Sequence, residues 1–149
     1  MNRALDRAAI ATLIPHAGAM CLLDSVLDWD ATRIRARSTS HARADHPLRG
    51  DGALHAVHLC EYGAQAAAVH GALVARAAGG APRAGLLAAL REVRLYVEAV
   101  DPAGTALDIE AECLLADDHG AQYAFRVARG GCLLAGGRAT IVYGAVAGS

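Results

Sequence analysis

A chain of 149 residues, 54% hydrophobic and 19% charged, is long enough to bury one core and is expected to form one domain over residues 1–149. It has no apolar run of about twenty residues, the length that crosses a membrane, so no membrane partner is expected. A formal net charge of −1 and an aromatic content of 4% argue against a nucleic-acid surface, which needs a basic patch and stacking rings.

The N-terminus and the cysteines predict a cytoplasmic protein. Residues 1–7 mix acidic and basic side chains ahead of an apolar run that is too short for a secretory signal. The cysteines lie far apart, form no CxxC pair and have apolar neighbours, so we expect buried thiols and neither zinc ligands nor disulfides. They are Cys21, Cys60, Cys113 and Cys132.

The first third of the chain predicts a short helix and two strands. Apolar residues at helical spacing indicate an amphipathic helix over residues 4–14, which Pro15 ends. Residues 20–28 are apolar enough for a buried strand. Residues 32–40 alternate, with arginines 33, 35 and 37 on one face. We interpret that face as solvated, and an anion site is the alternative.

One long helix and several alternating strands follow a polar loop at residues 41–52. The helix is expected over residues 54–78, ended by the glycines and proline at 79–82. Beyond it the apolar pattern has a period of two, which predicts antiparallel strands joined by turns rich in Asp and Gly. These strands cover residues 86–100, 107–113, 123–127 and 133–143.

The composition of the long helix predicts how the sheet is arranged. A helix that is apolar all round must be enclosed, and a sheet of about five strands encloses it only by curling round it. Small side chains on the helix let the strands approach closely. We therefore predict an α+β fold in which a curled antiparallel sheet wraps a central helix.

Glu61 stands out in the helix stretch "HLCEYGAQAAAVHG", residues 58–71. A carboxylate among Ala and Gly must be solvated, paired or functional, because burying an unpaired charge costs too much. Helical spacing places His58, Tyr62 and Gln65 on the same face as Glu61, at i, i+3, i+4 and i+7. We interpret Glu61 as functional, within a polar stripe on an apolar helix.

Several stretches are similar to the hot-dog-fold β-hydroxyacyl-acyl carrier protein dehydratases. "LIPHAGAMCLLDSVLDWD" (13–30) resembles their opening "LxPHRxPxLLxDRV", and "EYGAQAAAVHG" (61–71) resembles their "EAMAQA" helix. "REVRLYVEAVDPAG" and "LLAGGRATIVYG" match strand positions in a divergent branch, the predicted 3-hydroxyacyl-carrier-protein dehydratases of aryl polyene and related clusters. The resemblance covers nearly the whole chain. It implies a hot-dog fold and a homodimer with its active sites at the subunit interface.

The resemblance also implies a reaction. A 3-hydroxyacyl thioester, on acyl carrier protein or coenzyme A, loses water to give a trans-2-enoyl thioester, without a metal or an organic cofactor. Glu61 matches the acidic residue that assists the departing hydroxyl. Gln65 matches the glutamine that orients its neighbours by hydrogen bonding. With His58 and Tyr62, it is expected to contact substrate.

The histidine that takes the α-proton is less well defined by the sequence. In the family it lies in a Gly-His-Phe-Pro-Gly loop before the partner's helix. Here the loop reads "ADHPLRGDGALHAVHLCE", and His46 is the first candidate for a catalytic residue. His58, one turn before Glu61, can replace it, and His55 or His16 can also reach the site. His70 is expected to be a core histidine.

Two other functions stay open. Hot-dog thioesterases also carry a helix carboxylate and use it to activate water, and loss of the loop histidine would favour hydrolysis. A non-catalytic subunit is the other alternative. It would pair with a competent paralogous dehydratase and hold an acyl carrier protein.

Overall fold

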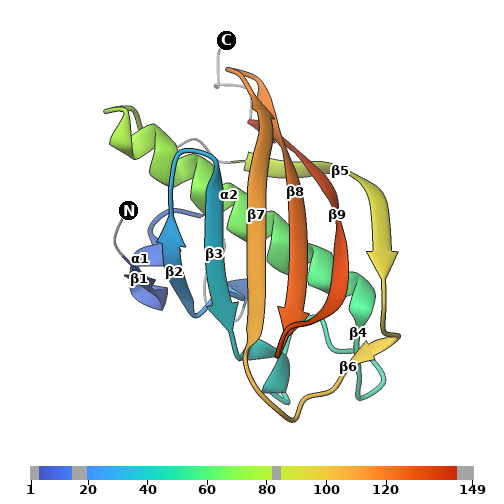
Figure 1. The fold of residues 1–149 in the computed structure, drawn as a ribbon. Helices are drawn as coiled ribbons and strands as arrows, with labels where there is room; N and C mark the ends of the chain where they lie inside the picture. The colour runs from blue at the N-terminus through green and yellow to red at the C-terminus, as the bar shows by residue number, and fades with distance from the viewer. Residues whose placement is uncertain (1–3, 15–19, 82–84, 144–149) are drawn as a thin grey trace.

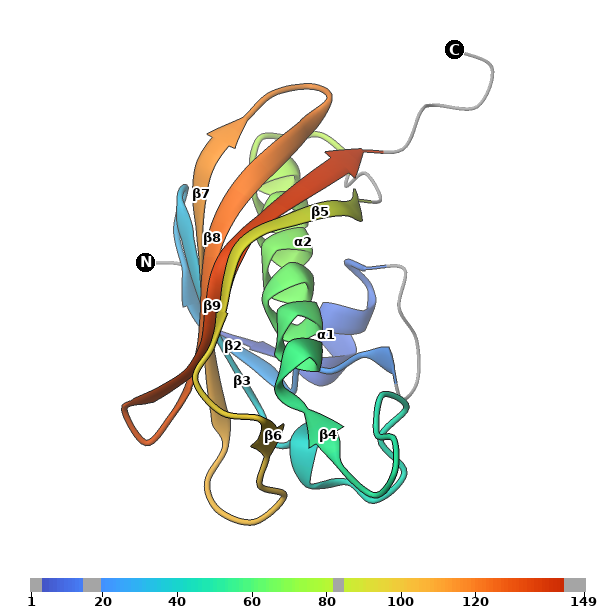
Figure 2. The ribbon, with the colours of Figure 1, turned by 90° about the vertical axis from the view of Figure 1, so that its right-hand side faces the viewer.

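A curved antiparallel sheet packs on one long helix, α2 (Leu59–Ala77), in the computed structural model, which describes residues 4–14, 20–81 and 85–143 (Figures 1 and 2). Within these residues the sheet has seven strands, in the order β1-β2-β3-β7-β8-β9-β5. Their bounds are β1 Leu5–Asp6, β2 Ser25–Trp29, β3 Arg33–Ser38, β5 Gly85–Leu95, β7 Leu107–Ala116, β8 Gly120–Arg129 and β9 Cys132–Tyr143.

The sheet curls round α2 as the composition of the helix predicts (Figure 2). Alternation in the central strands is confirmed, because Ile34, Ala111 and Phe125 lie opposite one another in register and are all buried. The arginines of β3 point to the outer face, where each forms an ion pair with a carboxylate of a neighbouring strand. Their interpretation as a solvated strand face agrees with this pairing.

The start of α2 is held by a second, two-stranded sheet. β4 (Leu54–His55) pairs with β6 (Ala99–Val100), and the backbone N–H of Ala56 donates to the carbonyl of Glu98. A single 3-10 turn, η3 (Ala56–His58), then leads into the helix. The predicted helix start at residue 54 is therefore wrong, because the backbone of residues 54–55 is used in strand pairing. The predicted strand 86–100 is divided as well, because Gly85–Leu95 (β5) pair with β9 whereas Ala99–Val100 (β6) pair with β4.

The N-terminal helix is shorter than predicted. α1 covers only Arg7–Ala11, because Leu5 and Asp6 pair with β2. The Asp6 carboxylate caps the helix by accepting from the N–H of Ala9 at 2.9 Å. Thr12 ends it, with its hydroxyl donating to the carbonyl of Ala9 at 2.7 Å.

The predicted strand over residues 20–28 is confirmed only in its second half, as β2. Cys21, Leu22 and Leu23 are buried but lie outside any strand. The N–H of Leu22 donates to the side-chain oxygen of Gln65, and its carbonyl accepts from the hydroxyl of Ser38. Side chains thus take the hydrogen-bonding groups that a neighbouring strand would otherwise use.

The far end of α2 is closed by two glycines, as predicted. Gly79 has a φ of 84°, and its N–H donates to the carbonyl of Arg76. The N–H of Gly80 reaches back to the carbonyl of Ala75 at 2.9 Å. This is a Schellman motif, in which glycine adopts the left-handed conformation that other residues avoid.

Two further predictions concern burial. Cys21 and Cys60 are buried as expected, whereas Cys113 is only half-buried and Cys132 is exposed at the start of β9, so the prediction of four buried thiols is wrong for Cys113 and Cys132. Among the described residues, no helix has the length and apolar character needed to cross a membrane.

In the described part of the chain three histidines are buried: His41, His46 and His70, with exposed fractions of 1%, 4% and 1%. Burial is the main cause that lowers the pKa of each below its ordinary value. His70 is the core histidine that the sequence predicts. Its Nε2–H donates to the carbonyl of Asp30 at 2.8 Å, and its Nδ1 accepts from the hydroxyl of Tyr123 at 2.6 Å.

We expect the free energy of unfolding to fall when the pH is lowered from 7.5 to 5.5. The unfolded chain takes up protons near pH 6.5, whereas the three buried histidines stay neutral to lower pH. Stability is therefore complete above about pH 7 and is lost below it, by at most about 1.4 kcal/mol per pH unit for each histidine. Urea unfolding at pH 7.5, 6.5 and 5.5 measures this slope, and carboxylates contribute little in this window. Constant stability across it would contradict the expectation.

Packing of α2 on the sheet gives a second prediction. A Cβ atom at Gly63 would overlap the ring of Phe125, whereas one at Gly71 would lie 3.2 Å from the terminal hydroxyl of Tyr143. Replacement of either glycine by alanine brings the same gain in helix propensity. Gly63→Ala should therefore destabilise the protein by about 1–3 kcal/mol, and Gly71→Ala should be neutral or stabilising. Thermal unfolding of the two variants tests this, and equal effects would count against close packing at Gly63.

Candidate functional site

Glu61 lies in the first turn of α2 and is half-buried. No hydrogen bond or ion pair joins its carboxylate to another residue in the described ranges 4–14, 20–81 and 85–143. The pKa of the neighbouring Cys60 thiol is raised, first by burial of the thiol and then by the negative charge of Glu61. A half-buried carboxylate without a partner in the described part of its own chain is available to a substrate or to a second subunit.

Tyr62 is fully buried beside Glu61 and belongs to a chain of hydrogen bonds. Its hydroxyl lies 2.9 Å from Nε2 of His46 and 2.7 Å from the hydroxyl of Ser40. The Ser40 hydroxyl lies 2.8 Å from that of Ser38, which donates to the carbonyl of Leu22. Burial raises the pKa of Tyr62 to about 12, so the phenol keeps its proton at neutral pH.

Gln65, one turn further along α2, holds the opening segment of the chain. Its side-chain oxygen accepts from the N–H of Leu22 at 2.9 Å, and its amide donates to the carbonyl of Met20 at 2.6 Å. The residue is 2% exposed. Both ends of the side-chain amide are thus bonded to backbone groups of the opening segment, and the predicted substrate contact of Gln65 stays a prediction.

His46 comes from the loop between η2 (Ser40–Ala42) and β4 and is buried against Tyr62. Its Nδ1 accepts from the N–H of Leu48 at 3.1 Å. Burial, followed by the charges of Arg49 and Arg43, lowers the pKa of His46. The same loop is fixed from its other side by Arg49, whose guanidinium donates to the carbonyl of His41 at 2.7 Å.

His58 and His55 are more open to solvent. His58 is the N-cap residue of α2 and is half-buried, and within the described residues its ring forms no hydrogen bond. His46 is bonded to Tyr62 in the first turn of the same helix, so the two histidines lie at the same end of α2. His55 is exposed on β4. His16 lies outside the described residues.

The predicted polar stripe is thus split in two. Tyr62 and Gln65 are buried and bonded to the surrounding chain, whereas His58 and Glu61 stay half-exposed at the helix start. The four residues share a helix face in sequence spacing, but the segments packed around α2 cover only two of them. The start of α2 therefore presents the Glu61 carboxylate and the His58 imidazole, and His46 is bonded to Tyr62 next to Glu61.

Two serines and an aspartate complete the site, and sequence reasoning did not assign the serines a role. Ser38 occupies the buried face of β3, so its place in the alternating pattern was a signal that its hydroxyl must be bonded. Ser40 gave no such signal. Asp24 accepts from the N–H and the hydroxyl of Thr39, at 2.7 and 2.6 Å, and so fixes the turn that carries Ser40.

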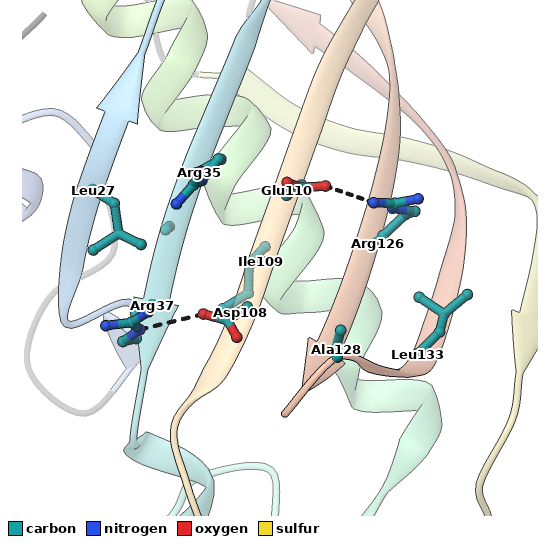
Figure 3. Close-up of a pocket in the computed structure, with 11 residues that line it drawn as sticks. Leu27, Arg35, Arg37, Asp108, Ile109, Glu110, Arg126, Ala128 and Leu133 are labelled. Carbon is teal, nitrogen blue, oxygen red and sulfur yellow. Dashed lines mark hydrogen bonds and ion pairs between the residues drawn. The ribbon is translucent and has the colours of Figure 1, made fainter.

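A hollow of about 420 Å³ lies on the opposite face of the sheet (Figure 3). Glu61, His46 and His58 do not line it. Charged side chains cross its rim in ion pairs, with Arg37 3.3 Å from Asp108 and Arg126 2.8 Å from Glu110. These charges neutralise one another, so the hollow is a solvated sheet surface and lacks the free acid that the start of α2 presents.

Comparison with solved structures gives strong matches. The chain is similar to the dehydratase heterocomplex ApeI:P from Xenorhabdus doucetiae, with a TM-score of 0.81, 26% identity and 91% of each chain covered. It also resembles a zebrafish thioesterase superfamily member 2, with a TM-score of 0.61, 15% identity, and 93% of this chain and 95% of that chain covered.

A third structure is the PaaI protein of the Escherichia coli phenylacetic acid degradation operon. Its TM-score is 0.60 at 16% identity, with 91% of this chain and 88% of that chain covered. At such low identity the zebrafish and PaaI matches show the fold alone. Together these structures confirm the hot-dog fold that the resemblance implied.

Sequence comparison identifies the family. No curated protein sequence matches the chain significantly. The ApeP-like family, described as ApeP dehydratase, matches residues 8–145. Because this match spans nearly the whole chain, and the heterocomplex match agrees with it, the protein belongs to the ApeP-like dehydratase family and is a dehydratase.

Proposed function

We propose that this dehydratase removes water from a 3-hydroxyacyl thioester held on an acyl carrier protein and produces a trans-2-enoyl thioester. Glu61 carries the proposal, since its half-buried carboxylate has no partner among the described residues and lies at the start of α2. The first N–H groups of a helical segment suit a developing negative charge, and here they belong to the turn η3, because the N–H of Leu59 is bonded to the carbonyls of Ala56 and Val57. Within the described residues, no side chain caps the N–H groups of η3. They would polarise the thioester carbonyl while Glu61 meets the hydroxyl.

The proposed reaction needs one base and one acid. A histidine takes the proton from the α-carbon, and the electron pair of that bond forms the double bond to the β-carbon. Glu61 gives a proton to the departing hydroxyl, which leaves as water. His46 and His58 are the two candidates for the base at this end of the helix. A final proton transfer from the histidine back to Glu61 restores the site.

Glu61→Gln should lower kcat/KM for dehydration by about 10²–10⁴, because the amide cannot give a proton to the leaving hydroxyl. Absorbance of the enoyl thioester follows the reaction, with a 3-hydroxyacyl group on carrier protein and on a small thiol surrogate. Glu112→Gln is the matched control, since this carboxylate is exposed on the outer face of the sheet and should leave the rate unchanged. A Glu61→Gln variant with the wild-type rate would end the proposal.

The same assay separates the alternatives. Release of free acid and thiol would identify hydrolysis, the thioesterase reaction. An inactive chain that becomes active when mixed with a paralogous dehydratase would identify a subunit that needs its partner. A reaction with the acyl-carrier-protein thioester but not with the coenzyme A thioester would show that the enzyme uses acyl groups carried by acyl carrier protein.

We also propose that β5 is the subunit interface. This strand has eleven residues, lies at the end of the sheet and pairs with β9 on one side only. An exposed edge strand of this length, whose first six residues carry no charge, is prone to unwanted pairing unless a partner covers it. Its exposed apolar side chains include Leu86, Leu90, Val93 and Leu95, with exposed fractions of 65%, 37%, 37% and 44%.

The partner on β5 is a second subunit of the same fold. The similarity to the ApeI:P complex supports a paralogous dehydratase subunit, and a second copy of this chain is the other possibility. Pairing of β5 strands would extend the sheet across both subunits. It would also bring the partner towards the half-exposed face of α2, where Ala68 and Ala75 lie.

Charge on β5 should break the assembly. Leu90→Arg introduces a charge that pairing would bury, so it should convert dimers to monomers. Leu115→Arg is the control, because Leu115 is 61% exposed but lies on β7, away from this edge. Light scattering after size-exclusion chromatography gives the mass of each, alone and with a paralogous subunit. A Leu90→Arg variant that still forms dimers would place the interface elsewhere.

A further inference from the structure

Arg49 lies half-buried in the loop that carries His46, and its guanidinium donates only to main-chain carbonyls within residues 4–14, 20–81 and 85–143. Nη2 donates to the carbonyl of His41 at 2.7 Å and to that of Arg43 at 3.1 Å. Nε donates to the same Arg43 carbonyl at 3.3 Å, and Nη1 donates to the carbonyl of Gly52 at 3.4 Å. No carboxylate in these ranges forms an ion pair with Arg49. This arginine therefore bonds the backbone of its own loop rather than a neighbouring acid.

The three carbonyls lie on both sides of His46, and we call the guanidinium with these carbonyls the Arg49 clip. Two of them precede His46 in the chain and the third follows it. Between them the N–H of His46 donates to the carbonyl of Arg43 at 3.3 Å, and Gly50 and Ala53 exchange backbone bonds at 2.9 Å. A planar fork of several N–H donors reaches carbonyls on both sides at once, whereas a lysine ammonium on its flexible chain has no such fork.

The conformation of this loop decides where the His46 ring lies relative to Glu61. The ring stacks on Tyr62 with the two centroids 6.1 Å apart, and Nε2 lies 2.9 Å from the phenol oxygen. Tyr62 directly follows Glu61 on α2. We infer that Arg49 is a positioning residue, which holds His46 beside the start of α2 by joining both sides of the His46 loop. This role rests on the proposed dehydration, with His46 as the histidine that accepts the α-proton and Glu61 as the acid.

The charge of Arg49 acts on the same ring. Burial is the first cause that lowers the pKa of His46, and the charge of Arg49 is the second. A base must be unprotonated to accept a proton, so a lowered pKa keeps His46 ready at neutral pH. Removal of a nearby positive charge should raise this pKa and move the fall of kcat/KM at acid pH to higher pH. The other charged or titratable groups around His46 are Arg43, His58, His41, Asp45 and Tyr62.

Kinetics of the assembled enzyme with a 3-hydroxyacyl thioester separate the clip from the charge. Arg49→Lys keeps the charge but loses the fork. Its kcat should fall by about 10–10²-fold with KM within about threefold, because a displaced base weakens only the transition state, and its acid limb should stay in place. Arg43→Gln is the matched control, since the Arg43 side chain bonds Asp45 and takes no part in the clip. Its kcat at pH 8 should equal that of wild type, while its acid limb should move to higher pH.

Amide hydrogen exchange tests the clip without any substrate. In the wild type, the bonded N–H groups of His46, Gly50 and Ala53 should be protected. Arg49→Lys should speed their exchange by about tenfold or more, because the loop then opens locally, and should leave the amides in the middle of α2 unchanged. Unchanged exchange across the loop would overturn the inference. Because this measurement needs no turnover, it stands even if the proposed reaction is wrong.

Two kinetic results would also overturn the inference. The wild-type kcat in Arg49→Lys would show that the clip does not position the base, and an equal loss of kcat in Arg43→Gln would assign the loss to charge. Thermal unfolding shows whether each variant is folded at the assay temperature. If Arg49→Lys is not, Arg49→Gln gives the same comparison against Arg43→Gln, since both lose one charge. A wild-type enzyme without dehydration would end the proposed function, while hydrogen exchange would still decide the clip.

Discussion

The need to satisfy buried polar groups on α2 decides how the chain around the site is arranged. Nearly half of this helix is alanine and glycine, yet Tyr62, Gln65 and His70 are buried in it. Each must find partners, because an unbonded polar group in the interior costs roughly 1–3 kcal/mol. Tyr62 and Gln65 find theirs in two segments before the helix, residues 20–22 and 38–46. The loop and the opening segment are therefore fixed on α2 by side chains.

The candidate site is formed by the polar residues of α2 that lack such hydrogen-bond partners. Glu61 and His58 lie beside the bonded residues, but their own subunit leaves them without partners among the described residues. Tyr62 keeps its proton, and Gln65 has both ends of its amide bonded, so these two stabilise the site. A rigid, fully bonded layer behind two free titratable groups suits proton transfer, because the reacting groups need not reorganise the structure behind them.

The two faces of the sheet serve different purposes. The inner face packs on α2 with residues such as Phe125, against which Gly63 leaves no room for a side chain. The outer face carries arginines paired with carboxylates and so remains compatible with water. The edge at β5 exposes apolar side chains such as Leu86 and Leu90 in its uncharged first half, and Arg91, Glu92 and Arg94 follow in its second half. The chain is thus incomplete at one edge, on the side where the helix is also half-open.

The sequence by itself determined the central features of this protein. A period of two predicted the core strands, small residues predicted the wrapped helix, and the carboxylate near its start made Glu61 the candidate acid. These features depend on local pattern, which one chain carries in full.

Only the tertiary structure decided the rest. Residues 21–23 are buried but are no strand, because Gln65 and Ser38 from distant positions bond the backbone of Leu22. The helix starts at Leu59 because residues 54–55 pair with 99–100. The orientation of His46 depends on a bond to Tyr62, sixteen residues away. Such contacts join segments whose separation no local pattern encodes, and they decide which polar residues are bonded and which stay free to react.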